Sequence, residues 1–333
     1  MTETLGLADE DQQGTLREIA MAALAAAGEI GVAARVVRTA ADEAAVDTLL
    51  LIGFPRIAPN MLARPKAARR ILWLEEPLPP AGDGRLRRGL RRATPPVRVV
   101  DPLHSLASRA GLGSITREWR ETAAIERERL RTLASLRSAR SAFDEYVVTT
   151  ETHRRSLAAE GLTSRVVHLG YHPLWAGRLV EADAPRDVAL LSFGQVHPRT
   201  RREGAHARLA AGLPPEMTLR VERNAYGDER AALLNRTRIV VDIQRVPGNF
   251  ASIRMMLAAA AGAAYVSEPI DDAGPWISGL HYLSSPLDEM PSLLGALLAD
   301  EQRRRTLVAE SQRLITEKLS LTDALRAILH GRS

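Results

Sequence analysis

Short runs of apolar and β-branched residues alternate with segments of helical period along most of the chain, and this alternation constrains the fold more than any other feature. Clear strand-like runs are Asp47–Gly53 and Val188–Phe193. Strands that alternate with helices form a parallel sheet whose two faces the helices cover. The chain is therefore predicted to be an α/β protein.

The strand-like runs form two similar series, separated by a polar linker at residues 178–186 that contains Pro185. At 333 residues the chain is long enough for two domains of roughly 150 residues each. Strands are predicted at Thr4–Leu7, Ala34–Val37, Asp47–Gly53, Arg70–Leu74, Val97–Asp101, Glu145–Thr149 and Arg165–Leu169 before the linker, and at Val188–Phe193, Leu219–Glu222, Ile239–Ile243, Ala263–Ser267 and Tyr282–Ser284 after it. Helices are predicted at residues 15–28, 115–141, 228–236 and 250–262, and over most of the chain beyond Pro286.

Charge and cysteine content narrow the classes of function. The chain has 45 Lys and Arg against 40 Asp and Glu, which gives a net charge of +5. This balance is a weak argument for nucleic acid but suits an anionic substrate such as a nucleotide diphosphate. The chain has no cysteine, which excludes disulfides, thiolate metal sites and cysteine nucleophiles.

The N-terminal segment Met1–Gln13 is acidic and lacks the basic-then-apolar pattern of a signal peptide. The most apolar run, Ile253–Val266, is too short to span a bilayer. We therefore expect a cytoplasmic protein without a transmembrane segment.

Ligands of open α/β sheets bind beyond the carboxyl ends of the strands, near the starts of helices. The segment Ser192–Arg202 follows a predicted strand in this way, and Gly194 permits a tight turn there. Cations at a helix start oppose the helix dipole, so their presence is explained if an anion binds among them. A solvated first helical turn is the alternative. The cationic residues of this segment are His197, Arg199, Arg201 and Arg202.

A second candidate is Arg245–Arg254, between a predicted strand and an Ala-rich helix. Gly248 and Asn249 free the backbone, while Ser252 and the first amides of the helix can donate hydrogen bonds to a phosphate. Arg254 can bind the same diphosphate through two parallel hydrogen bonds. Capping alone does not explain the flanking arginines, so a ligand site is favoured.

A third candidate, Ser267–Asp272, follows the next strand, and its Glu268 can accept hydrogen bonds from ribose or sugar hydroxyls. In the first half, Glu75 and the pair Asp101 and His104 follow strands and are candidate general bases. A purely structural role is the alternative for each of them.

The arginine-rich run from Arg85 to Arg98 lacks the interleaved aromatic residues that stack on bases. A solvated helix face is therefore the favoured interpretation, with an anionic acceptor as the alternative, and no nucleic-acid partner is predicted.

Taken in order, these segments resemble GT-B glycosyltransferases of the group 1 branch, most closely the spore-maturation (CgeB-like) glycosyltransferases. The likeness extends over most of residues 45–330. It rests on the order of several segments along the chain rather than on one motif. In the second half it rests on Asp187–Gly194, Leu233–Asp242, Ser252–Gly262, Glu268, His281–Glu289 and Leu298–Arg305. In the first half it rests on Asp47–Gly53, Arg70–Pro77, Tyr146–His153 and Val166–Pro173.

The resemblance implies two Rossmann-like domains that face each other across a cleft. It implies an acceptor-side domain at residues 1–177, a donor domain at 186–315, and a C-terminal helix at 316–333 that packs back toward the first domain. The residues implied to face the donor diphosphate are Gly194, His197, Arg199, Arg202, Gly248, Asn249, Ser252 and Arg254. Many relatives carry a ribose-binding glutamate where this chain has Leu257, so nucleoside recognition is expected to differ.

The expected function is metal-independent transfer of a sugar from a nucleotide-diphosphate sugar to the hydroxyl of a small molecule, a glycan or a protein. No cofactor beyond the donor substrate is expected, and a homodimer is left open. Two alternatives stay open at this point. One is a GT-B-like binding or regulatory protein without chemistry, and the other is a nucleotide-sugar epimerase that uses Glu268 and Asp271.

Overall fold

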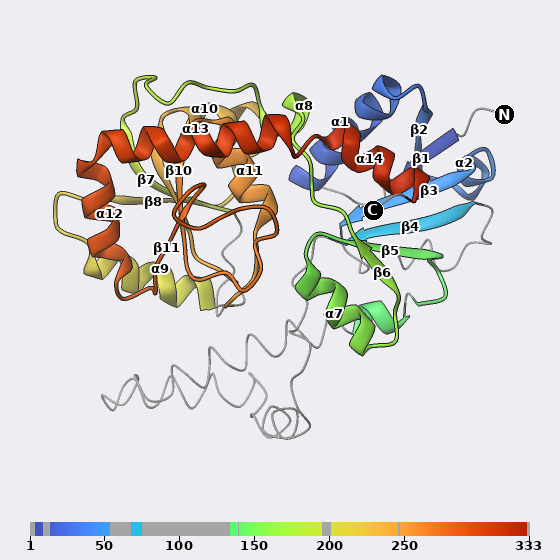
Figure 1. Cartoon of the computed structure of the whole chain (residues 1–333), viewed down its shortest axis with the longest axis horizontal. Helices are drawn as coiled ribbons and strands as arrows, with labels where there is room; N and C mark the ends of the chain where they lie inside the picture. The colour runs from blue at the N-terminus through green and yellow to red at the C-terminus, as the bar shows by residue number, and fades with distance from the viewer. Residues whose placement is uncertain are drawn as a thin grey trace.

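The computed structural model describes residues 4–8, 14–53, 68–74, 134–138, 140–194, 201–245 and 247–331. Within this part of the chain, two parallel sheets lie side by side, each flanked by helices (Figure 1). The predicted strand Val97–Asp101 and most of the predicted helix at 115–141 lie outside the described residues, as does the arginine-rich run.

The first sheet has six parallel strands in the order β2-β1-β3-β4-β5-β6. Its centre is buried on both faces, because every residue of the central strand Thr48–Gly53 is buried. Helices on both faces bury a parallel sheet in this way. The strands are β1 Thr4–Ala8, β2 Ala33–Val37, β3 Thr48–Gly53, β4 Arg69–Leu74, β5 Glu145–Val148 and β6 Ser164–Val166.

The second sheet has five parallel strands in the order β11-β10-β9-β7-β8. The predicted strands of both series that fall within the described residues are confirmed, with small shifts at their ends. The strands are β7 Val188–Phe193, β8 Leu219–Glu222, β9 Thr237–Asp242, β10 Ala264–Ser267 and β11 Leu283–Ser284.

The helices cover the sheets and connect them. The predicted helices near the N-terminus, in the second series and beyond Pro286 are confirmed. The three short helices α2, α7 and α8 were not predicted. The helices are α1 Thr15–Glu29, α2 Ala40–Ala44, α7 Glu151–Ala159, α8 Pro173–Ala176, α9 Arg201–Gly212, α10 Gly227–Asn235, α11 Ser252–Ala260, α12 Met290–Ala299, α13 Glu301–Glu317 and α14 Leu321–His330. None of the helices in the described ranges is long and apolar enough to cross a membrane.

Helix α2 forms through its cap rather than through an apolar stripe. The Thr39 hydroxyl accepts a hydrogen bond from the Asp42 amide at 3.1 Å, and the Asp42 carboxylate accepts one from the Thr39 amide at 2.9 Å. This reciprocal capping box satisfies donors that the first helical turn leaves open. The adjacent Glu43 is buried and receives two hydrogen bonds from Arg70 of β4, at 2.7 and 2.9 Å.

The C-terminal helices return to the first sheet: α13 runs along the second domain and α14 lies over the first (Figure 1). The Leu321 amide donates to the Tyr171 carbonyl at 2.9 Å, and Thr322 donates to Glu29 of α1 at 2.5 Å. Arg165 of β6 donates to the Ala327 carbonyl at 2.7 Å. These contacts join chain segments that are far apart in sequence.

The domain boundaries near residues 177, 186 and 315 stay predictions.

Gly170 lies where the C-terminal segment crosses the end of the first domain. A Cβ atom there would lie 2.2 Å from the Leu321 amide nitrogen and 2.3 Å from the Ser320 carbonyl oxygen. We predict that Gly170→Ala lowers the free energy of unfolding by about 1–3 kcal/mol or more, because backbone must move to make room. Urea denaturation measures this loss.

The matched control is Gly28→Ala in α1, where a Cβ would meet nothing within 4 Å. Alanine is the better helix former, so this control should gain about 0.5–1 kcal/mol. Equal effects at both glycines would contradict the packing described for α14.

Candidate functional site

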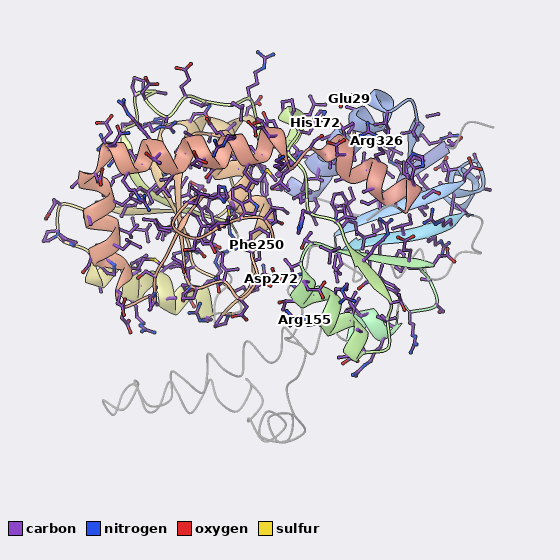
Figure 2. The ribbon with its side chains drawn as sticks, in the orientation of Figure 1. Glu29, Arg155, His172, Phe250, Asp272 and Arg326 are labelled. Atoms are coloured by element: carbon purple, nitrogen blue, oxygen red, sulfur yellow. The ribbon has the colours of Figure 1, made fainter. Side chains whose placement is uncertain are left out.

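The strands of the second sheet are parallel, so their carboxyl ends meet at one edge. Gly194 follows β7, Asp242 ends β9 and Ser267 ends β10. In open α/β sheets this edge is where ligands bind. Figure 2 shows Phe250 and Asp272 on the side of the second domain that faces the first.

A pocket of about 290 Å³ lies at this edge and is completed by the first domain. It is formed by the starts of α1 and α9, the end of β7, the segment from Arg223 into α10, the residues after β9, and the start of α11 with the loop before it. Its volume is close to the lower end of the range for small-molecule sites, about 300–1,000 Å³. The lining residues are Thr15, Leu16, Phe193, Gly194, Arg202, Arg223, Ala225, Tyr226, Arg230, Gln244, Arg245, Asn249, Phe250, Ala251, Ser252, Ile253, Arg254 and Leu257.

Two guanidinium groups approach each other beside Gly194. This glycine has φ +101°, and a Cβ there would lie 3.6 Å from a terminal nitrogen of Arg202 and 3.8 Å from one of Arg254. The positive φ favours glycine here, whereas a Cβ would make only ordinary contacts with the two arginines. The backbone and two cations thus share one small region of the pocket.

One buried carboxylate lies between these cations and the core of the sheet. Asp242 is fully buried, and its Oδ1 lies 2.7 Å from Nε of Arg254. Burial followed by the charge of Arg254 lowers the pKa of Arg202 to about 9. Burial is the larger of these two causes, and Arg202 stays protonated at neutral pH.

A neutral histidine fixes the helix that carries Arg202. His206 Nε2 lies 2.8 Å from the Ser192 hydroxyl, and Nδ1 lies 2.7 Å from the Arg202 carbonyl. Burial followed by the charge of Arg202 lowers the pKa of His206 to about 4. A neutral ring that donates from Nδ1 and accepts at Nε2 satisfies both contacts.

The start of α11 contributes backbone donors. Its first residue is Ser252, and no side chain caps the helix at Ala251. The preceding turn is held by Gln244, whose Oε1 accepts from the Gly248 amide at 2.6 Å. Gly248 has φ +81°, where glycine is favoured. Because Ala251 and Ser252 line the pocket, the positive end of the helix faces it.

The structure brings five of the predicted ligand residues together in the pocket lining: Gly194, Arg202, Asn249, Ser252 and Arg254. Gly248 lies in the same loop but outside the lining. The predicted residues His197, Arg199, Glu75, Asp101 and His104 lie outside the described residues. The ligand roles of all of them stay predictions.

Glu268 lies outside the pocket lining, in contact with the start of α9. Its Oε2 accepts hydrogen bonds from Arg201 at 2.8 Å and from the Gln244 amide at 2.9 Å. Arg201 also donates to Oε1 of Glu268. The carboxylate therefore ties α9 to the loop that precedes α11.

The sequence did not point to the contribution of the first domain to the pocket. Arg230 of α10 is buried and donates to Thr15 at 2.7 Å, to Glu18 at 2.6 Å and to the Trp175 carbonyl at 3.1 Å. Glu18 also accepts from the Gly227 amide at 2.8 Å. These contacts hold the start of α1 against α10 of the second domain.

On the opposite side, Asp272 reaches the first domain. Its Oδ2 accepts a hydrogen bond from the Thr152 amide, in the first turn of α7, at 2.8 Å. The same carboxylate accepts from the Gly274 amide at 3.0 Å. Carboxylates are favourable at a helix start, so this contact stabilises the approach of the two domains.

Asp242→Asn tests the charge arrangement at the site. Removing one partner of a buried ion pair leaves the other uncompensated, and we expect a loss of about 3–5 kcal/mol in the free energy of unfolding. The control Asp187→Asn breaks an exposed pair with Arg236 and should cost no more than about 1 kcal/mol. Equal losses in the two variants would contradict the role assigned to Asp242.

The lowered pKa of His206 predicts that the free energy of unfolding depends on pH. The unfolded chain takes up a proton at this ring near pH 6.5, whereas the folded chain takes it up only near pH 4. The unfolded state therefore binds more protons in this window, and the stability due to His206 falls as the pH is lowered through it. Unfolding of wild type and His206→Gln at several pH values measures the difference, and parallel curves would contradict it.

Comparisons with known proteins agree with this architecture. Residues 195–330 match the family described as glycosyl transferase-like. No curated protein sequence matches the chain. Among solved structures, HepE of Anabaena in complex with UDP-glucose superposes with a TM-score of 0.61 at 9% identity, covering 98% of each chain.

Two further structures show the same fold. An alpha-glucosyltransferase in complex with UDP and a 13-mer DNA has a TM-score of 0.60 at 6% identity and covers 99% of each chain. TarM of S. aureus has a TM-score of 0.53 at 12% identity and covers 94% of this chain and 58% of its own. The narrower likeness to the spore-maturation branch stays a prediction. The chain has the GT-B fold of glycosyltransferases, with two Rossmann-like domains, and its C-terminal part resembles the glycosyl transferase-like family.

Proposed function

We propose that the chain transfers a sugar from a nucleotide-diphosphate sugar to an acceptor hydroxyl. The observation that carries this proposal is the approach of Arg202 and Arg254 beside Gly194, next to the start of α11. A diphosphate suits this arrangement, because it carries charge for both guanidinium groups and oxygens for the backbone amides. HepE, which shares the fold, binds UDP-glucose, and this supports a nucleotide-sugar donor here.

In the proposed reaction, the acceptor oxygen forms a bond to the anomeric carbon while the bond from that carbon to the diphosphate breaks. The leaving diphosphate gains negative charge as the bond breaks. Fixed donors at that point stabilise the transition state more than the ground state. Two guanidinium groups and the α11 amides supply the positive charge and the hydrogen-bond donors that stabilise the leaving diphosphate. We therefore propose that transfer is metal-independent.

The nucleoside is expected to lie against the apolar part of the pocket. Leu16, Phe250, Ile253 and Leu257 line it, and they come from both domains. Because Leu257 has no hydrogen-bonding group, we propose that the donor is held mainly through its diphosphate. The proton acceptor stays open, with Glu75, Asp101 and His104 as the candidates.

An epimerase of the same architecture is less well supported. That reaction needs carboxylates directed at the sugar, whereas Glu268 is occupied by Arg201 and the Gln244 amide. A binding protein without chemistry would hold the nucleotide but would not hydrolyse or transfer the sugar. Release of free nucleotide from a donor sugar distinguishes a transferase from such a binding protein.

Arg254→Ala is predicted to weaken UDP binding about 10- to 100-fold, because charged hydrogen bonds contribute about 1.5–3 kcal/mol. Isothermal titration calorimetry measures this affinity, and thermal unfolding confirms that the variant is folded. The control Arg208→Ala removes an exposed arginine of α9 that pairs with Asp288. Unchanged affinity in Arg254→Ala would refute the proposed diphosphate site.

A thermal-shift panel of UDP, GDP, TDP and ADP sugars identifies the donor base. A shift with one or more of these sugars is expected, and it should be lost in Arg254→Ala. No shift with any of them would contradict the proposal.

A further inference from the structure

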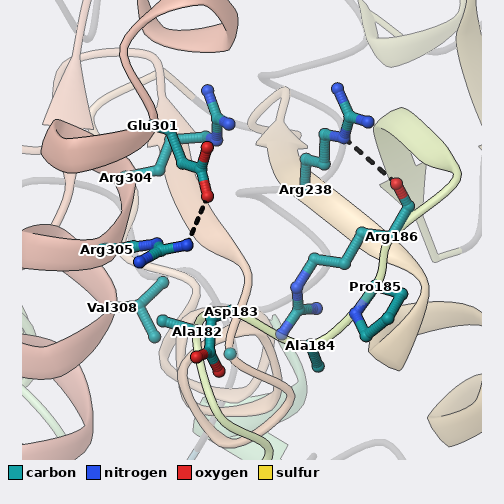
Figure 3. A pocket seen from close by; sticks show the side chains of 11 residues that line it. Ala182, Asp183, Ala184, Pro185, Arg186, Arg238, Glu301, Arg304, Arg305 and Val308 are labelled. Atoms are coloured by element: carbon teal, nitrogen blue, oxygen red, sulfur yellow. Dashed lines mark hydrogen bonds and ion pairs between the residues drawn. The ribbon is translucent and has the colours of Figure 1, made fainter.

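A second pocket lies in the donor domain and shares no lining residue with the pocket between the domains (Figure 3). It has a volume of about 240 Å³. Four parts of the chain surround it: residues 182–186 of the interdomain segment, the start of β9, Gly262 before β10, and the first turns of α13. Since a water molecule takes about 30 Å³ in the liquid, the pocket has room for a small anion with some of its hydration.

Guanidinium groups dominate the lining of this pocket. Four arginines border it, against two carboxylates, and one of these carboxylates pairs with an arginine of the same helix. The lining therefore carries an excess of positive charge. The arginines are Arg186, Arg238, Arg304 and Arg305, and the carboxylates are Asp183 and Glu301.

Backbone carbonyls hold three of these arginines in place, beginning with Arg186 and Arg304. Arg186 donates to the carbonyls of Asn235 at 3.1 Å and of Thr237 at 2.9 Å, and Arg304 donates to the Leu297 carbonyl at 2.6 Å. Carbonyl oxygens orient a guanidinium group but do not neutralise its charge. The cations are thus positioned before any ligand arrives, which lowers the entropic cost of binding.

The remaining two arginines complete one side of the pocket. Arg238 donates through Nε to the Arg186 carbonyl at 3.1 Å, and Arg305 pairs with Glu301 at 2.6 Å. Figure 3 shows Arg238 and Arg304 directed toward the same end of the pocket. Burial followed by the charge of Arg238 lowers the pKa of Arg304, as expected for cations that repel each other.

We propose that this second pocket binds a phosphate group, held by Arg238, Arg304 and Arg305. Planar guanidinium groups that are already fixed match the oxygens of phosphate, and a phosphate relieves their mutual repulsion. The ligand is either a small soluble phosphate or the headgroup of an acidic lipid, and both present the same chemistry. The inference does not depend on the glycosyltransferase proposal.

The test compares binding of pyrophosphate to wild type and to Arg238→Ser/Arg305→Ser by calorimetry. Both arginines are exposed, so the variant should fold, and thermal unfolding checks this. The control Arg154→Ser/Arg326→Ser removes the same charge from exposed pairs outside both pockets. We expect the affinity for pyrophosphate at one of the two kinds of site to fall about tenfold or more in the Arg238→Ser/Arg305→Ser variant. The same affinity should be unchanged in the control.

Arg254→Ala, titrated in parallel, separates the two pockets. Loss of pyrophosphate binding in Arg254→Ala alone, with Arg238→Ser/Arg305→Ser like wild type, overturns this inference and leaves the donor site intact. Loss confined to Arg238→Ser/Arg305→Ser supports the second pocket and counts against the donor site.

Sedimentation with vesicles that contain phosphatidic acid identifies the source of the phosphate. Binding to these vesicles that depends on Arg238 and Arg305 points to a lipid headgroup, whereas binding of pyrophosphate alone points to a soluble ligand. Equal binding of both probes by wild type and by Arg238→Ser/Arg305→Ser refutes the site.

Discussion

Two guanidinium groups and one buried carboxylate lie at the point where the strands of the second sheet end. Asp242 is fully buried beside Arg254, and the cation of Arg202 is nearly as deeply buried. Such a group of charges is costly to remove from water unless each charge is compensated. Arg202 and Arg254 both line the pocket beside the start of α11. The proposed preference for a diphosphate follows from these two cations together with the amides of the helix start.

The first domain completes the same pocket, since Thr15 and Leu16 of α1 belong to its lining. Arg230 reaches from α10 to Glu18 in α1, and Asp272 reaches from the second domain to the first turn of α7. These contacts lie on two sides of the pocket, and α14 adds a third connection to the first domain. A change in the separation of the domains would therefore change the shape of the pocket. The pocket and the contacts between the domains therefore depend on each other.

The sequence predicted the fold well where apolar periodicity carries the signal. The strands were placed within a few residues, whereas α2 and α7 were missed because their ends are set by caps at Thr39 and Thr150 rather than by a long apolar stripe. In the site, Arg202 and Arg254 were predicted because they follow strand ends. The pairing of Arg230 with a residue 212 positions away has no local signal, and only the fold reveals it.

The central claim is that the two arginines and the start of α11 form a diphosphate site. A crystal structure with bound UDP tests it most directly. The account predicts both phosphates beside Gly194, with Arg202 and Arg254 within hydrogen-bond distance and at least one α11 amide donating to them. Clear density for UDP at any other place, with this region unchanged, would contradict the account.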